Sequence, residues 1–310
     1  MQGKIALFYY KICYKLREYE RKYKLPFNMQ FCRTIKVFDT DERNKLLVEA
    51  ITNQIPFLVG KFGAVEMFAM RTVEFNDSRK ANKACEHLCK YAGFFPNDID
   101  KMKKFHEIMK GTASKVDILE KWDKPCEDYF IRKYCKNLKG FFLHFASYLG
   151  EPHSWSHILK GKRVLVIHPF EKSICEQYKK RQYLFPNSDV LPEFELLTIK
   201  AVQTQAYNKD SRFQDWFEAY QYMCQEIDQL DFDVAFIGCG AYGLPLGAYI
   251  KDKGKVAIHL GGSLQLMFGI MGGRWEHEDW VNKMRNEYWI RPMEEERIEG
   301  FEQIEGGCYW

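Results

Sequence analysis

The 310-residue sequence lacks an apolar run long enough to cross a lipid bilayer, which takes about 20 consecutive apolar residues. The longest candidate, residues 5–14, is short and is interrupted by Lys11. No small-residue cleavage site accompanies this run, so the sequence does not predict a secretory signal. These absences lead us to expect a soluble protein.

A strong net charge is missing as well. The formal charge is +4 at pH 7, which is too small to predict nucleic-acid binding. The charge is unevenly placed, because residues 1–36 hold nine basic and two acidic side chains, a net charge of +7. We expect these residues to form a basic helical extension. Residues 1–24 would either contact the inner, anionic face of the cytoplasmic membrane or form a solvated helix that packs on the body.

The ten cysteines lack the spacing of a disulfide scaffold, so we expect reduced thiols in a cytoplasmic protein. Cys85 and Cys89 flank His87, but no second pair of ligands follows, and their spacing fits a helix face better than a zinc site. The sequence also contains neither a Gly-x-Ser-x-Gly elbow nor a Gly-x-x-x-x-Gly-Lys-Ser/Thr loop. Serine hydrolases and P-loop kinases therefore have no motif support.

Short β-branched runs that alternate with helical segments are present from residue 162 onward. The predicted strands span 163–168, 196–202, 233–237 and 256–260, and the predicted helices 173–183 and 213–229. This alternation predicts an α/β fold with a Rossmann-like parallel sheet flanked by helices. We place this unit at about residues 160–292, within a domain of residues 37–310. Before it we expect a helix at 40–54, strands at 55–60 and 141–145, and mostly helix over 64–135.

A glycine motif directly follows the third of these strands. The residues Gly238-Cys239-Gly240-Ala241-Tyr242-Gly243 match Gly-x-Gly-x-x-Gly, and Pro245 suits the first turn of a following helix. Glycines in such a turn allow backbone N–H groups to approach a phosphate. We therefore predict that Gly238, Gly240, Tyr242 and Gly243 bind a phosphate or diphosphate. The alternative is a turn whose glycines serve packing alone.

The ends of two other predicted strands also carry candidate ligands. Gly261-Gly262-Ser263 follows the strand at 256–260, and a second helix N-terminus there would suit a diphosphate. A nicotinamide cofactor would need a carboxylate at this strand end, and none is present. His168 leaves the first strand of the unit. The predicted ligand contacts are His168, His259, Gly261, Gly262, Gln265 and Arg274. For His168 the alternative is a turn residue, for His259 a core histidine, for Gln265 a solvent-facing side chain, and for Arg274 a surface arginine stacked on Trp275.

A fourth candidate lies far away in the sequence, where the strand at 55–60 leads into Gly60-Lys61-Phe62-Gly63-Ala64-Val65-Glu66. Lys61 could balance phosphate charge, and Gly63 belongs to the turn. Glu66 could serve as a general base, a metal ligand or an acceptor for hydroxyls. The alternative for Glu66 is a carboxylate stabilised at a helix start.

Taken together, these segments resemble the bacterial GT-D-type glycosyltransferases, in a branch linked with surface-polysaccharide synthesis. The matching segments are Leu58–Met67, Val164–Phe170, Leu191–Glu195, Asp233–Gly247, Ile258–Trp275 and Glu305–Trp310. The resemblance implies a GT-D-like fold and a glycosyltransferase of the hexosyltransferase class. Such an enzyme would move a sugar from a nucleotide-diphosphate-sugar donor to a glycan or lipid-linked glycan acceptor.

The family carries an Asp-x-Glu signature tied to a divalent metal, and the matching triplet here is Ala64-Val65-Glu66. Glu66 is kept, whereas Ala64 replaces the aspartate, which weakens the case for Mn²⁺ or Mg²⁺. We expect Glu66 to take the proton of the acceptor hydroxyl, with Glu193 as the second choice. The rival interpretations are another nucleotide- or SAM-dependent transferase and a non-catalytic protein that binds sugar nucleotides.

Overall fold

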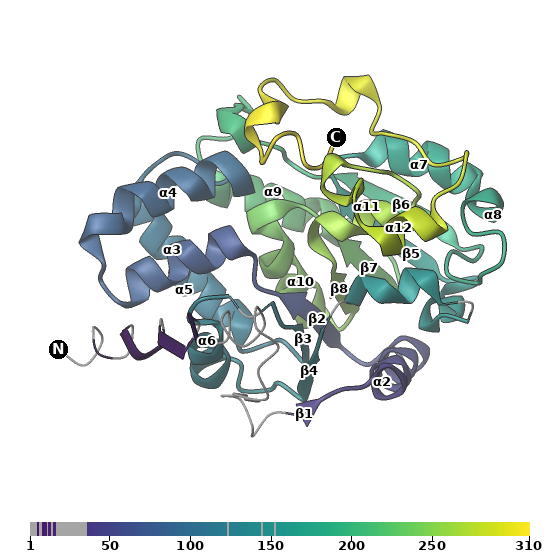
Figure 1. The fold of residues 1–310 in the computed structure, drawn as a ribbon, viewed down its shortest axis with the longest axis horizontal. Coiled ribbons are helices and arrows are strands. Elements are labelled where there is room, and N and C mark those ends of the chain that lie inside the picture. The colour runs from purple at the N-terminus through teal and green to yellow at the C-terminus, as the bar shows by residue number, and fades with distance from the viewer. Residues whose placement is uncertain are drawn as a thin grey trace.

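The computed structural model of the chain describes residues 5, 8–10, 12, 13, 15, 16, 36–122, 124–143, 145–151 and 153–310. Its described strands form one eight-stranded sheet in the order β1-β4-β3-β2-β8-β7-β5-β6 (Figure 1). Every neighbouring pair runs parallel, which confirms the predicted α/β class. The strands are β1 (Lys36–Val37), β2 (Phe57–Lys61), β3 (Ile118–Glu120), β4 (Gly140–Phe142), β5 (Arg163–His168), β6 (Glu195–Lys200), β7 (Val234–Ile237) and β8 (Val256–His259).

Helices cover both faces of this sheet. They are α2 (Thr40–Thr52), α3 (Ala64–Glu74), α4 (Ser78–Ala92), α5 (Ile99–Ala113), α6 (Glu127–Tyr134), α7 (Glu171–Lys179), α8 (Arg181–Leu184), α9 (Trp216–Asp228), α10 (Gly243–Asp252), α11 (Leu264–Met267) and α12 (Asp279–Met284). In Figure 1 the helices α3, α4, α5, α9 and α10 lie on one side of the sheet, while α2, α7, α11 and α12 lie on the other.

The central strands are buried on both faces because their side chains alternate between two cores. In β5, Leu165 and Ile167 pack with α3, α9 and α10, whereas Val164 and Val166 pack with α2 and α7. This alternation explains why the strands read as unbroken apolar runs, as expected for a covered parallel sheet. The six strands predicted from the sequence correspond to β2, β4, β5, β6, β7 and β8. Their predicted bounds agree with the observed ones to within a few residues.

Two strands, β1 and β3, were not predicted from the sequence. Residues 64–135 were expected to be mostly helical, yet β3 lies inside that range and pairs with both β2 and β4. The missed β3 is only three residues long, so it shows too little periodicity to be separated from helix. The pairing of β2 with β8 joins the N-terminal strands and the Rossmann-like strands into a single sheet.

The N-terminal extension predicted for residues 1–36 falls mostly outside the described residues. Those that are described between residues 5 and 16 are helical. Within the part of the chain that the structure describes, no helix is long and apolar enough to cross a membrane.

Candidate functional site

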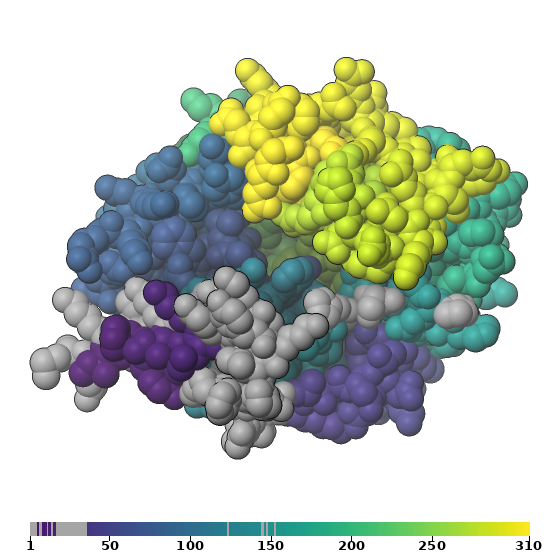
Figure 2. Space-filling view, viewed as in Figure 1, coloured from purple at the N-terminus to yellow at the C-terminus, as the bar shows by residue number. Residues whose placement is uncertain are grey.

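A cavity of about 400 Å³ lies at the carboxyl ends of six strands. Its lining includes residues 61–66 at the end of β2, residues 122 and 124 after β3, residues 168–170 at the end of β5, residues 202–205 after β6, residues 238–241 after β7, and His259 with residues 261–263 at the end of β8. In the space-filling view a hollow lies between α3 and α4 and the yellow C-terminal segment (Figure 2).

The topology accounts for this position. The chain leaves β5 and β8 toward α7 and α11, which pack on one face of the sheet. It leaves β2 and β7 toward α3 and α10, which pack on the opposite face. Neighbouring strand ends therefore diverge, and a crevice opens outside their carboxyl ends.

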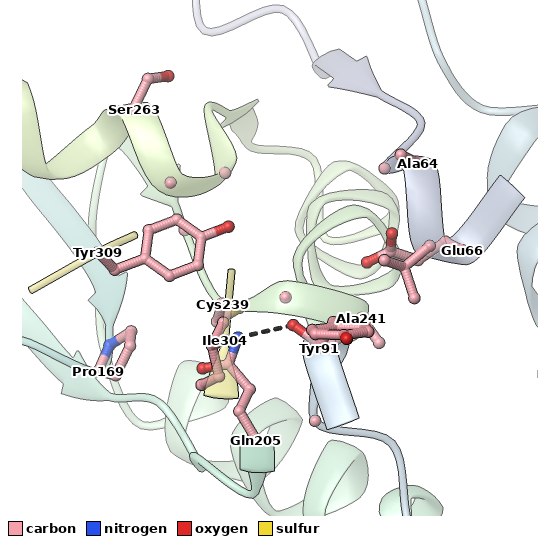
Figure 3. Close-up of a pocket in the computed structure, with 18 of the residues that line it drawn as sticks. Ala64, Glu66, Tyr91, Pro169, Gln205, Cys239, Ala241, Ser263, Ile304 and Tyr309 are labelled. Carbon is pink, nitrogen blue, oxygen red and sulfur yellow. Dashed lines mark hydrogen bonds between the residues drawn. The ribbon is translucent and has the colours of Figure 1, made fainter. Parts of the chain in front are cut away.

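Most of the predicted site residues line this cavity. They are Lys61, Gly63, Glu66, His168, Gly238, Gly240, His259, Gly261, Gly262, Gln265 and Arg274. Figure 3 shows the cavity with Glu66 on one side and Tyr309 and Ser263 on the other. Tyr242 and Gly243 do not line it; Tyr242 is buried and stacks on Trp216, with ring centroids 5.0 Å apart.

Glu193, the second predicted base, is not part of this site. It precedes β6 and therefore lies at the amino end of the sheet, where its backbone C=O accepts a hydrogen bond from Gly161. Its side chain is 77% exposed and pairs with Arg181 at 2.9 Å. Because the carboxyl ends of parallel strands share the opposite edge, Glu193 cannot reach the cavity.

The glycine turn after β7 is packed against the protein's own atoms. Gly240 has a positive φ of 55°, and a β-carbon there would lie 2.6 Å from the carbonyl oxygen of Ala92. A β-carbon on Gly238 would lie 2.6 Å from the carbonyl oxygen of Gly261, and one on Gly243 would overlap the His259 ring. Packing thus accounts for each of the three glycines, while the backbone of residues 238–241 still faces the cavity.

The second helix N-terminus is weaker than predicted. After β8 the chain makes a 3-10 turn at Gly261–Ser263 and then α11, which has only four residues. The Ser263 hydroxyl donates to the carbonyl of Leu260 and caps no helical N–H. So short a helix carries little dipole, and any anion contact at this end depends on individual backbone groups.

Glu66 sits in the first turn of α3, whose N-cap is Gly63. Its carboxylate folds back over Gly63, where a β-carbon would overlap Oε2 of Glu66. Burial raises the pKa of Glu66, opposed by a hydrogen bond from its own backbone N–H and by the charge of Lys61. A raised carboxyl pKa suits a general base near neutral pH.

Trp122 and Lys124 also line the cavity, although neither was predicted as a site residue. Both follow β3, a strand that was not predicted either. The indole of Trp122 is 46% exposed, with Lys61 Nζ 5.0 Å and Lys124 Nζ 5.7 Å from the ring. Lys61 also pairs with the buried Glu120 at 3.3 Å. The buried carboxylate of Glu127 accepts hydrogen bonds from the backbone N–H groups of Trp122 and Lys124, which fixes this wall.

Both histidines of the site are neutral near pH 7. Burial lowers the pKa of His168 to about 3, and its Nδ1 accepts a hydrogen bond from the backbone of Phe170 at 3.0 Å. Burial and the charge of Lys61 lower the pKa of His259 to about 3. Nδ1 of His259 has no hydrogen-bond partner among the described residues. These rings can therefore contribute hydrogen bonds but not positive charge.

The C-terminal segment closes one side of the cavity. Arg274 pairs with Glu305 and donates to the hydroxyl of Tyr309 at 3.2 Å. Gln265 is buried rather than solvent-facing, and its amide donates to the carbonyls of Ile270 and Tyr309. Arg274 thus keeps its side chain at the cavity through partners that lie some 30 residues further along the chain.

The GT-D fold-like domain model matches residues 39–267. The chain belongs to the GT-D-like family. A solved structure described as "The highly conserved domain of unknown function 1792 has a distinct glycosyltransferase fold" is similar to 73% of this chain and 78% of its own, with 14% identity and a TM-score of 0.41. No curated protein gives a significant match. The family match gives residues 39–267 a GT-D-like fold.

The side chains of this GT-D-like protein offer little to a divalent metal. Among the described residues, no group of three His, Cys, Asp or Glu side chains could hold one. Ala64 has no oxygen to contribute, and the nearby cation Lys61 acts on Glu66 in place of a second carboxylate. Mn²⁺ or Mg²⁺ does not fit these side chains as a resident cofactor, since both ions prefer several oxygen ligands.

Proposed function

We propose that this GT-D-like protein is a glycosyltransferase that uses a nucleotide-diphosphate-sugar donor in the synthesis of a surface polysaccharide. Its acceptor would be a hydroxyl of a glycan or lipid-linked glycan. The observation that carries the proposal is the placement of Glu66, a carboxylate of raised pKa, in a cavity that also holds three cationic side chains, Lys61, Lys124 and Arg274.

The diphosphate of the donor would bind between the cations and the strand ends. Lys61 and Arg274 line the cavity together with the backbone of residues 238–241 and 261–263. Negative charge grows on the nucleoside diphosphate as it leaves, and fixed cations and N–H groups stabilise such charge. His168 and His259, being neutral, would hydrogen-bond to phosphate or sugar oxygens.

Glu66 would act on the acceptor. Its carboxylate takes the proton of the acceptor hydroxyl, whose oxygen forms a bond to the anomeric carbon of the donor sugar. The bond from that carbon to the phosphate oxygen breaks, and its electron pair leaves with the nucleoside diphosphate. No step requires a metal ion.

One observation favours a second candidate, a non-catalytic protein that binds sugar nucleotides. Ala64 stands where the resembling enzymes carry an aspartate, which would reduce catalysis while leaving the donor cavity intact. Another nucleotide- or SAM-dependent transferase has less support, because β8 ends in His259 rather than in a carboxylate that could hold a ribose.

Calorimetry on the full chain tests the proposal, using UDP-, GDP- and dTDP-sugars with and without Mn²⁺. We expect one nucleotide class to bind and to be consumed when a glycan acceptor is added. No binding of any sugar nucleotide would contradict both candidates. Binding without turnover on any acceptor would favour the non-catalytic protein.

A further inference from the structure

The N-terminal helix exposes an apolar surface to solvent. Of its described side chains, Ile5 is 62% exposed and Phe8 68%, and three more are at least 40% exposed. Those three are Tyr9, Ile12 and Leu16. Isolated exposed apolar residues are ordinary on protein surfaces, whereas a contiguous group on one element indicates a binding surface.

Helical geometry places these five residues together. At 3.6 residues per turn, positions 5, 8, 9, 12 and 16 fall within an arc of about 100°. Tyr10 and Cys13 lie on another side of the helix: Cys13 is buried, and the Tyr10 ring lies 5.5 Å from that of Tyr129 in α6. The helix is therefore held to the body by one side, and its apolar arc faces outward.

The charge of this segment indicates the partner. Lys15 is exposed and lies seven residues after Phe8, which places it about 20° outside the apolar arc. Residues 1–36 carry a net charge of +7 within a chain of net charge +4. Two copies meeting through this segment would repel each other, whereas an anionic surface would attract it.

We propose that this helix lies in the plane of an anionic lipid bilayer, with Ile5, Phe8, Tyr9, Ile12 and Leu16 buried among the lipids and Lys15 at the headgroups. An apolar arc with aromatic residues in a segment rich in basic residues is the pattern of interfacial helices. In Figure 2 the purple residues of this helix lie on the same face of the molecule as the hollow of the candidate site. Membrane docking would bring that site close to lipid-linked molecules.

Vesicle flotation with the full chain tests this inference, comparing neutral phosphatidylcholine vesicles with vesicles that also contain phosphatidylglycerol. We expect the protein to float with the anionic vesicles at least tenfold more than with the neutral ones, and less as salt rises. The variant Phe8→Gln/Ile12→Gln should lose most of this binding, because glutamine keeps helix propensity while removing apolar area. Lys15→Gln should weaken binding to anionic vesicles alone.

The matched control is Tyr183→Gln/Tyr288→Gln, which removes another exposed aromatic pair, stacked at 4.9 Å between α8 and the segment before Trp289. It should bind vesicles as the parent does. Equal binding to both vesicle types, no binding, or full binding by Phe8→Gln/Ile12→Gln would each overturn the inference. The inference would also be overturned if the parent formed a concentration-dependent dimer that Phe8→Gln/Ile12→Gln abolishes and the control variant does not. The assay contains no sugar nucleotide, so its result is independent of the proposed function.

Discussion

Gly243 and His259 lie so close together that a β-carbon on the glycine would overlap the imidazole ring. Gly243 begins α10, and His259 ends β8. The glycine therefore lets the helix approach the strand while His259 keeps its place in the cavity wall. The neutral state of His259 depends on that burial.

Substitution of Gly243 by alanine should destabilise the protein. The extra methyl group must displace His259 or α10, and overpacking of this kind costs roughly 1–3 kcal/mol. Gly111→Ala is the matched control, since Gly111 lies in α5 and a β-carbon there meets nothing within 4 Å. That change should stabilise the helix by about 0.5–1 kcal/mol. Urea unfolding of both variants measures the difference, and equal stabilities would contradict the packing role of Gly243.

Glu66→Gln should remove sugar transfer while leaving donor binding and folding intact. The amide keeps the shape of the side chain but cannot accept the proton, and loss of a general base costs about 10²–10⁴-fold in rate. Glu193→Gln should leave turnover unchanged, because Glu193 lies at the opposite end of the sheet. Steady-state kinetics and calorimetry on the two variants check this. Full activity of Glu66→Gln would exclude Glu66 as the base.

The pH profile of the transferase should have a single acidic limb set by Glu66. The base must be ionised, and its pKa is raised above the usual 4.5 by burial, so kcat/KM should fall as pH drops through that raised value. His168 and His259 have pKa values of about 3 and stay neutral throughout this range. His168→Gln and His259→Gln can therefore change the rate but not the position of the limb. A shift of the limb in either histidine variant would assign it to that histidine.

The sequence predicted the sheet and the edge on which the cavity lies, because the runs that became β2, β5, β7 and β8 are apolar, short and followed by glycine or histidine. It could not show what each glycine touches, since Gly238, Gly240 and Gly243 meet Gly261, Ala92 and His259 only after folding. Trp122 and Lys124 were missed because β3 is too short to be recognised within a helical region. Glu193 was wrongly chosen because the resemblance of residues 191–195 was followed, although Glu193 precedes the predicted strand at 196–202 and so lies at the amino end of the sheet.

A buried network between the two helices α3 and α6 should make stability depend on pH. Glu74 at the end of α3 accepts hydrogen bonds from the hydroxyls of Tyr129 at 2.7 Å and Tyr134 at 2.8 Å, and it pairs with Lys133. Burial alone would raise the pKa of Glu74, but these three partners outweigh it and lower the pKa to about 2. The ionised carboxylate therefore stabilises the folded chain above the unfolded pKa near 4.5, and this contribution is lost as pH falls toward 2.

The contribution of Glu74 at pH 7 should be on the order of 2–3 kcal/mol, because its side chain is only 7% exposed. Urea unfolding of the parent should show stability falling between pH 4.5 and pH 2, and Glu74→Gln should lose the part of that fall, about 2–3 kcal/mol, that Glu74 contributes. Glu193→Gln, which removes an exposed carboxylate, should keep it. If Glu74→Gln and the parent lose the same stability across this range, other carboxylates must carry the acid sensitivity, and the bonds from Tyr129, Tyr134 and Lys133 contribute little to the docking of α6 on α3.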